Sequence, residues 1–119
     1  MPAPVGPYTP IVRAGDWLIC SGQLGMRDGA LVDGGVQAQA RQAITNLGAL
    51  LEGEGASLAQ VVKTTVFLAH ISDFALVNEA YVECFGDNRP ARSAFAVAAL
   101  PMGGLVEIEA WAWAPAPRP

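Results

Sequence analysis

The sequence predicts a two-layer sandwich of the α+β class, in which two helices cover one face of a mixed sheet. Two short β-favouring runs come first, and two segments with helical spacing of apolar residues then alternate with strands. The resulting order is ββαβαββ, so both helices can pack on one face of the sheet as crossover connections. The chain has 119 residues, of which 52% are hydrophobic and 15% charged, which suits one core. We therefore expect a single domain over residues 1–119.

The first elements are a β-hairpin and a helix. Residues 11–13 and 17–21 favour strands and flank the turn-forming sequence Ala14-Gly15-Asp16. A polar, glycine-rich link follows, and a helix is then predicted that ends at Gly53 and Gly55. Its apolar stripe consists of Val36, Ala40, Ala43, Ile44, Leu47, Leu50 and Leu51.

The second half of the chain contains three strands and one helix. Residues 61–68 are dense in Val, Thr and Phe, which indicates a strand in the centre of the sheet. Ser72 is the expected N-cap of a helix that stops near Gly86. Its apolar stripe consists of Phe74, Val77, Tyr81, Cys84 and Phe85. Strands are predicted at residues 92–98 and 105–113, followed by a proline-rich tail at 114–119.

The last predicted strand has two different faces. Small and branched apolar side chains alternate with acidic and aromatic ones, and the first set suits packing under the helices. The first set is Val106, Ile108, Ala110 and Ala112, and the second is Leu105, Glu107, Glu109, Trp111 and Trp113. Exposing the tryptophans to water is unfavourable, at about 25 cal/mol per Å² of apolar area, so we expect a subunit interface on this face.

Composition and charge exclude several classes of function. The net charge is −4 and the Lys and Arg residues are dispersed, so nucleic acid is not an expected partner. Cys20 and Cys84 are too few and too far apart for a disulfide framework, and we expect reduced, buried thiols. The N-terminus lacks the basic and apolar regions of a signal peptide, and no apolar run reaches the length of about 20 residues that spans a bilayer. We therefore expect a cytoplasmic protein that does not enter a membrane.

The usual catalytic groups are absent from the sequence. Any Ser-His-Asp or Cys-His system would have to use the one histidine, His70, for which a surface or loop position is preferred. Two distant cysteines and one histidine lack the spacing of a metal site, and no phosphate-binding or dinucleotide motif is present. The remaining candidates are Arg92 and Glu107, which each lie near the start of an otherwise apolar strand. From the pattern alone, a structural role is preferred to a functional one for both residues, because a charged side chain on such a strand usually lies at an edge or reaches solvent.

Eight short segments, in order along nearly the whole chain, resemble the RidA (YjgF) family, also labelled endoribonuclease L-PSP. They are Gly6-Pro7-Tyr8, Ser21-Gly22-Gln23, Gln39-Ala40-Arg41-Gln42 with Asn46-Leu47, Val61-Val62-Lys63-Thr64-Thr65-Val66-Phe67, Asp73-Phe74 with Val77-Asn78 and Tyr81, Pro90-Ala91-Arg92-Ser93, Leu100-Pro101, and Glu107-Ile108-Glu109-Ala110. The resemblance implies a chorismate-mutase-like fold that assembles as a homotrimer around a central barrel, with a site between subunits. It also implies hydrolysis of enamines and imines, such as 2-aminoacrylate, to 2-keto acids and ammonia, without metal or cofactor.

The resemblance also implies roles for particular residues. Arg92 would hold the substrate carboxylate through two parallel hydrogen bonds, and Glu107 would direct a water onto the imine carbon, with Glu109 as the alternative. Binding residues are implied at Tyr8, Ser21, Gly22, Asn78 and Ala94, of which Ala94 replaces a frequent Cys or Thr. The plain alternatives are that Tyr8 closes the core, Asn78 bonds helix ends and Ser21 stabilises a strand end.

Two other functions fit the same sequence. A trimer that binds a small 2-keto acid without catalysis, as a sensor or chaperone-like partner, would use the same Arg92. An endoribonuclease, an activity attributed to some members of the family, is disfavoured by the acidic charge and by the lack of an acid-base histidine.

Overall fold

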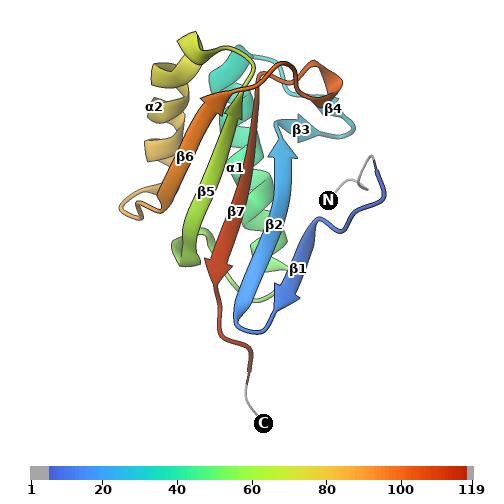
Figure 1. Ribbon diagram of the computed structural model, residues 1–119, viewed down its shortest axis with the longest axis vertical. Coiled ribbons are helices and arrows are strands. Elements are labelled where there is room, and N and C mark those ends of the chain that lie inside the picture. Colours follow the sequence, from blue (N-terminus) through green and yellow to red (C-terminus); the bar gives the residue numbers. More distant parts are fainter. Residues whose placement is uncertain (1–5, 118–119) are drawn as a thin grey trace.

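The computed structural model describes residues 6–117, and it contains two helices and seven strands over that range (Figure 1). The first five residues and the last two residues of the predicted tail lie outside the described residues. In chain order the elements are β1 (Ile11–Ala14), β2 (Trp17–Leu24), β3 (Met26–Arg27), β4 (Ala30–Leu31), α1 (Gly35–Glu52), β5 (Val61–Leu68), α2 (Phe74–Phe85), β6 (Ala91–Ala96) and β7 (Val106–Trp113). Apart from the small β3–β4 pair, this is the predicted order of elements.

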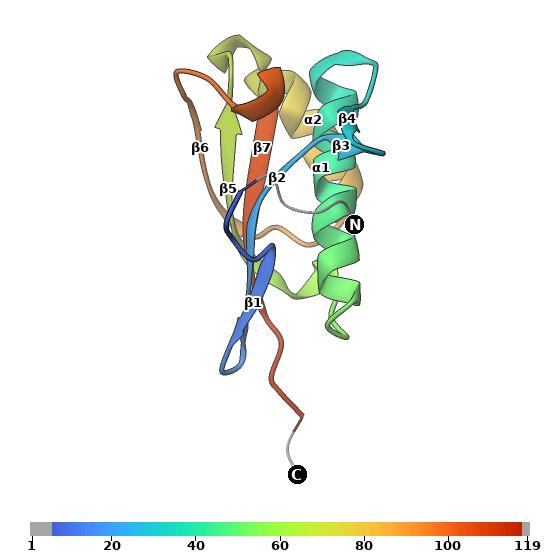
Figure 2. The ribbon, with the colours of Figure 1, turned by 90° about the vertical axis from the view of Figure 1, so that its right-hand side faces the viewer.

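The main sheet has five strands in the order β1-β2-β7-β5-β6. Strands β5 and β6 are parallel and every other neighbouring pair is antiparallel, so the sheet is mixed as predicted. Both helices lie on the same face of this sheet (Figure 2). The expectation of a central strand at residues 61–68 is confirmed, because β5 pairs with β7 on one side and with β6 on the other.

The hydrophobic core fills the space between the helices and the sheet. All seven predicted apolar positions of α1 are buried, and so are the four inward-facing residues of β7. Several of these residues are alanines, which let the helix approach the sheet closely. At Gly25, after β2, a side chain would come within 2.5 Å of the Gln39 backbone in α1. Complete burial of a leucine such as Leu47 contributes about 1.5–3 kcal/mol, so this layer stabilises the fold.

Local structure differs from the prediction at several places. Strand β2 runs to Leu24 rather than to residue 21, and β6 ends at Ala96 rather than at residue 98. The glycine-rich link contains the β3–β4 hairpin, whose turn uses left-handed backbone at Asp28 (φ 55°) and Gly29 (φ 82°). Its two-residue strands are too short to show periodicity. The prediction of Ser72 as N-cap is wrong, because a 3₁₀ turn spans Ile71–Asp73 and Asp73 takes the N-cap position without a side-chain capping bond.

The two cysteines lie in different environments. Cys20 is a buried core residue of β2, where burial raises the pKa of its thiol to about 12, whereas Cys84 in α2 is only half-buried. Both are free thiols, so the expectation of burial holds fully for Cys20 alone. No helix within residues 6–117 is long and apolar enough to cross a bilayer.

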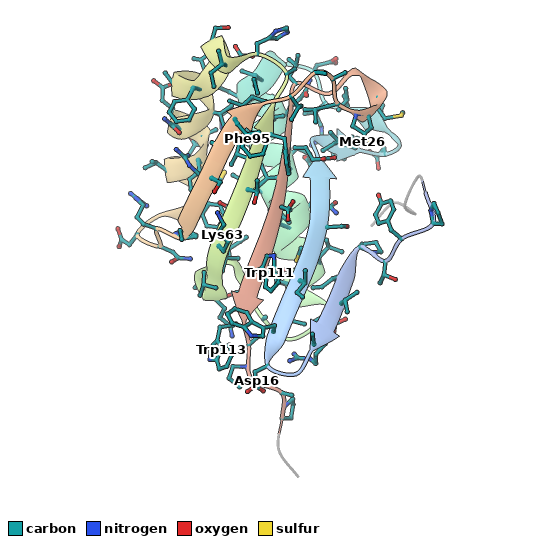
Figure 3. The ribbon with its side chains drawn as sticks, in the orientation of Figure 1. Asp16, Met26, Lys63, Phe95, Trp111 and Trp113 are labelled. Carbon is teal, nitrogen blue, oxygen red and sulfur yellow. The ribbon has the colours of Figure 1, made fainter. Side chains whose placement is uncertain are left out.

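The sheet face opposite the helices, which we call the open face, carries a group of aromatic rings. Trp111 and Trp113 of β7 remain 40% and 45% exposed, as the alternation predicted. Trp17 of β2 contacts both edge-on, with ring centroids 6.0 and 4.9 Å away. Figure 3 shows the side chains on this face, including Phe95 of β6 and Lys63 of β5.

Candidate functional site

Arg92 lies near the start of β6, and its side chain turns toward helix α2. Its Nη1 donates a 2.7 Å hydrogen bond to Oδ1 of Asn78. The guanidinium carbon lies 5.0 Å from the centre of the Tyr81 ring and 5.3 Å from that of Phe74, which is within cation–π range. Positions 74, 78 and 81 share one face of α2, because residues four and seven apart align along a helix. One helix face therefore holds the guanidinium.

The Tyr81 ring is itself anchored in the core. Its hydroxyl shares a 2.7 Å hydrogen bond with Oγ1 of Thr64, which is fully buried in β5. The ring of Phe85 lies 4.6 Å away on the same helix. Burial raises the pKa of Tyr81, although the Thr64 hydrogen bond and the Arg92 charge act in the opposite direction, so the side chain is a neutral phenol at neutral pH.

The charge of Arg92 has no carboxylate partner among the described residues. The single ion pair in that part of the chain joins Arg41 and Glu83 on the helix surfaces, at 2.6 Å. Arg92 is half-buried, and within residues 6–117 the only hydrogen bond of its side chain goes to Asn78, although a guanidinium has five N–H donors. A partly desolvated cation with free in-plane donors favours an anionic ligand, above all a carboxylate.

Glu107 lies near the start of β7 on the open face, next to Glu109. The side chain is half-buried and passes directly over Gly22 of β2, where an added methyl group would approach its carboxyl carbon to 2.8 Å. Burial, and secondly the charge of Glu109, raises the pKa of Glu107. A carboxyl group with a raised pKa is a better proton acceptor once ionised, which suits a general base.

The other predicted binding residues have varied surroundings. Ser21 adjoins Gly22 at an irregularity in the β2–β7 pairing, and its backbone N–H and hydroxyl both donate to the Pro10 carbonyl, at 2.8 and 3.1 Å. These bonds are those expected if Ser21 stabilises a strand end.

Tyr8 is 45% exposed, which contradicts the alternative that it closes the core. The bond to Arg92 likewise contradicts a helix-end role for Asn78. Ala94 follows Arg92 by two residues and is half-buried.

Within one chain the predicted residues form two separate groups. Arg92, Asn78 and Ala94 lie on the helix side of the sheet, whereas Glu107 lies with Ser21 and Gly22 on the open face. Arg92 pairs with Thr64 in β5, and Glu107 pairs with Phe67, three residues further along the same strand. Two strand spacings of about 4.8 Å and three rises of about 3.3 Å put the two Cα atoms roughly 14 Å apart.

Two residues that the sequence places only in the core belong to the environment of Arg92. The apolar stripe of the second helix accounts for Phe74 and Tyr81 without giving them a role at the site. Their spacing, three and four residues from Asn78, puts them on the helix face that carries Asn78, and this is the signal that could have linked them to the site. Among the described residues, no group of three or more His, Cys, Asp and Glu side chains is arranged to hold a metal ion.

Comparison with known proteins gives consistent matches. The chain matches the family model described as endoribonuclease L-PSP over residues 1–114. A 2-iminobutanoate/2-iminopropanoate deaminase of Bos taurus is 50% identical over 111 residues, which are 92% of this chain and 81% of the relative. Crystal structures of RidA from the Antarctic bacterium Psychrobacter sp. PAMC 21119 and of E. coli TdcF with bound serine share the fold. Their TM-scores are 0.90 and 0.89 at 45% and 36% identity, covering 94% of this chain in both cases and 92% and 91% of the other chains.

The fold and the site together define a small α+β protein with a half-buried arginine that can receive an anion. The chain belongs to the endoribonuclease L-PSP family, which contains the RidA and YjgF proteins, so the resemblance seen in the sequence is confirmed.

Proposed function

We propose that this protein hydrolyses reactive enamine and imine intermediates to 2-keto acids and ammonia. The observation that carries the proposal is the guanidinium of Arg92, which is half-buried, held by α2 and without a carboxylate partner among residues 6–117. Relatives named as 2-iminobutanoate/2-iminopropanoate deaminases, at about half identity over most of the chain, support this substrate class. Serine bound to TdcF is likewise a small molecule with a carboxylate.

In the proposed reaction the substrate carboxylate accepts two hydrogen bonds from Arg92, which fixes the adjacent imine carbon. Glu107 accepts a proton from a water as the water oxygen bonds to that carbon, and the nitrogen gains a proton to give a carbinolamine. The carbinolamine hydroxyl then loses its proton and the amine nitrogen gains one, so the C–O bond becomes a carbonyl as the C–N bond breaks, releasing ammonia and a 2-keto acid. An enamine enters the same sequence after it takes up a proton at carbon and becomes the imine. The net reaction consumes one water, and in this scheme the side chains of the protein position the substrate and move the proton.

The separation of the two groups supports a site formed between copies of the chain. Arg92 and Glu107 lie on opposite faces, so the Arg92 group of one copy must meet the Glu107 group of another. The exposed tryptophans of the open face suit such contact, since burial of aromatic rings stabilises an interface. We therefore propose the chorismate-mutase-like homotrimer, with the open faces forming a central barrel. Tyr8, Ser21, Gly22, Asn78 and Ala94 would line each shared site.

The test generates imines in place with an amino-acid oxidase or a dehydratase and follows 2-keto acid release with and without the protein. Acceleration is expected. Arg92→Ala should abolish it while the mass in solution stays that of the trimer, and Glu107→Gln should lower turnover and spare carboxylate binding. No acceleration across several amino acids would refute the enzyme, full activity of Arg92→Ala would refute the site, and a stable monomer would refute the interface.

A second candidate is a non-catalytic trimer that binds small carboxylates as a sensor or chaperone-like partner. It is favoured by the fact that carboxylate binding requires the donors of Arg92 and does not require Glu107. Saturable pyruvate binding without faster imine hydrolysis would establish it. Ribonuclease activity is less well supported, since the protein is acidic and its one histidine, His70, is exposed just after β5, before α2.

A further inference from the structure

We propose that Phe74 and Tyr81 are positioning residues, which hold the plane of the Arg92 guanidinium through its faces and leave its N–H edge free for the substrate carboxylate. The inference rests on the proposed function, because it concerns how that site binds its ligand. Neither residue needs to touch the substrate. Each acts through Arg92.

The contacts of Arg92 with the other described residues leave most of its N–H donors unoccupied. A guanidinium offers two kinds of surface, a flat face that attracts aromatic rings and a planar rim of N–H donors. Phe74 and Tyr81 contribute ring contacts at 5.3 and 5.0 Å, which consume no donor. Asn78 accepts one hydrogen bond from Nη1. Most of the rim is therefore available for the two parallel bonds that a carboxylate forms.

A carboxylate partner would hold Arg92 in a different way from the aromatic rings. A neighbouring aspartate or glutamate would also fix an arginine, but it would neutralise the charge and occupy the same donors that a substrate requires. Arg92 has no such partner within the described residues. Aromatic side chains are the alternative that restricts a long, flexible side chain and keeps its full charge, which lowers the entropy lost on ligand binding.

The rings of Tyr81 and Phe74 are anchored to different extents. Tyr81 is only 4% exposed and is tied to Thr64, the residue of β5 that pairs directly with Arg92. The strand that carries the arginine and the helix that carries the ring are thus linked beside the guanidinium. Phe74 is 38% exposed, so its ring forms the outer side of the same arrangement. Tyr81 fixes the position, and Phe74 limits outward movement.

The experiment measures kcat/KM for imine hydrolysis, and the dissociation constant of pyruvate, for Phe74→Leu and Tyr81→Leu. Each change should lower kcat/KM by about tenfold, within the range expected for loss of a partly desolvated cation–π contact, and should weaken pyruvate binding to a similar extent. Tyr81→Phe retains the ring and should keep kcat/KM within about threefold of wild type. Leu76→Ala is the matched control on α2, since Leu76 is 44% exposed and lies outside the ring contacts.

Measuring Phe74→Leu in an Arg92→Lys variant separates a positioning role of the rings from a general packing role. In Arg92→Lys the compact ammonium has no plane for the rings to orient, so adding Phe74→Leu should change the residual kcat/KM and pyruvate binding by less than about twofold. An equal loss in both backgrounds would assign the rings a structural role and overturn the proposal. Phe74→Leu also covers the case in which Tyr81→Leu fails to fold, since Phe74 is the more exposed ring.

Failure of this proposal and failure of the proposed function give different results. If the wild type accelerates hydrolysis and Arg92→Ala does not, but Phe74→Leu matches Leu76→Ala, the positioning role alone is refuted. If the wild type gives no acceleration, the proposed function fails, and the pyruvate titrations still decide the role of the rings. Unchanged pyruvate binding in Phe74→Leu would then refute it.

Discussion

The contact between Gly22 and Glu107 gives a quantitative prediction for a single methyl group. A Cβ atom at position 22 would lie 2.8 Å from the carboxyl carbon of Glu107 and 2.9 Å from its Cγ and Oε1. Carbon atoms pack best at about 3.5–4.0 Å, so in Gly22→Ala the carboxyl group must move by roughly 1 Å. A misplacement of about 1 Å in a catalytic group can reduce the rate by about 10²-fold. We expect a loss of kcat of that order.

The assay for Gly22→Ala is the coupled imine hydrolysis, with Gly48→Ala as its matched control. An alanine at position 48 in α1 would meet Leu58 at an ordinary 3.5 Å, so activity should not change, and the helix should gain up to about 1 kcal/mol. In a Glu107→Asp background the shorter side chain leaves more room for the methyl group at position 22. Gly22→Ala should therefore reduce kcat by a smaller factor there. A kcat for Gly22→Ala within threefold of wild type would show that the glycine does not seat the carboxylate.

Two further predictions concern ionisation and stability. Because a base must be ionised and the pKa of Glu107 is raised, kcat should fall on acidification at a pH above the ordinary glutamate range. Glu109→Gln removes one cause of the raised pKa and should move this fall to lower pH in a kcat–pH profile, whereas complete loss of activity would make Glu109 the base. Tyr81→Phe leaves the buried Thr64 hydroxyl without its partner and should lower the free energy of unfolding by about 1–3 kcal/mol in urea titrations. Adding Thr64→Val to Tyr81→Phe should recover much of this loss, and strictly additive losses would contradict the reasoning.

Periodic features of the fold could be predicted from the sequence, because a repeat shows which face of an element is apolar. The alternation in β7 placed Glu107 and the tryptophans on the face away from the helices, and this is confirmed. The β3–β4 hairpin could not be predicted in this way, since its strands have two residues each. At Ser72 the side-chain preference for N-caps suggested a helix start, but the 3₁₀ turn moved the start of α2 beyond it.

The surroundings of Arg92 were beyond the sequence patterns for a different reason. The strand β6 reads Ala-Arg-Ser-Ala-Phe-Ala, which has small residues on both faces and gives no alternation from which to orient the arginine. The stripe of α2 correctly indicated that Val77, Tyr81 and Phe85 face inward, whereas Phe74 is 38% exposed and Cys84 only half-buried. It did not indicate which strand these residues meet. Register between a helix and a strand is set by the packing of the whole layer, so the pairing of Tyr81 with Arg92 emerges only in three dimensions.

The placement of Arg92 and Glu107 on opposite faces makes a test of the shared site possible without further structural work. In the proposed trimer, Arg92→Ala should be inactive and Glu107→Gln should keep only a low turnover when each variant assembles alone. The two variants are unfolded, mixed in equal amounts and refolded together. Half of the chains then carry an intact Arg92, and the other half carry an intact Glu107. If each site takes the two residues from different copies, about a quarter of the sites contain both, and about a quarter of wild-type activity should return. A site within one chain can never recover in this mixture, because every chain lacks one of the two residues. Mixed trimers that form, as shown by mass, but stay inactive would therefore refute the shared site while leaving the assembly intact.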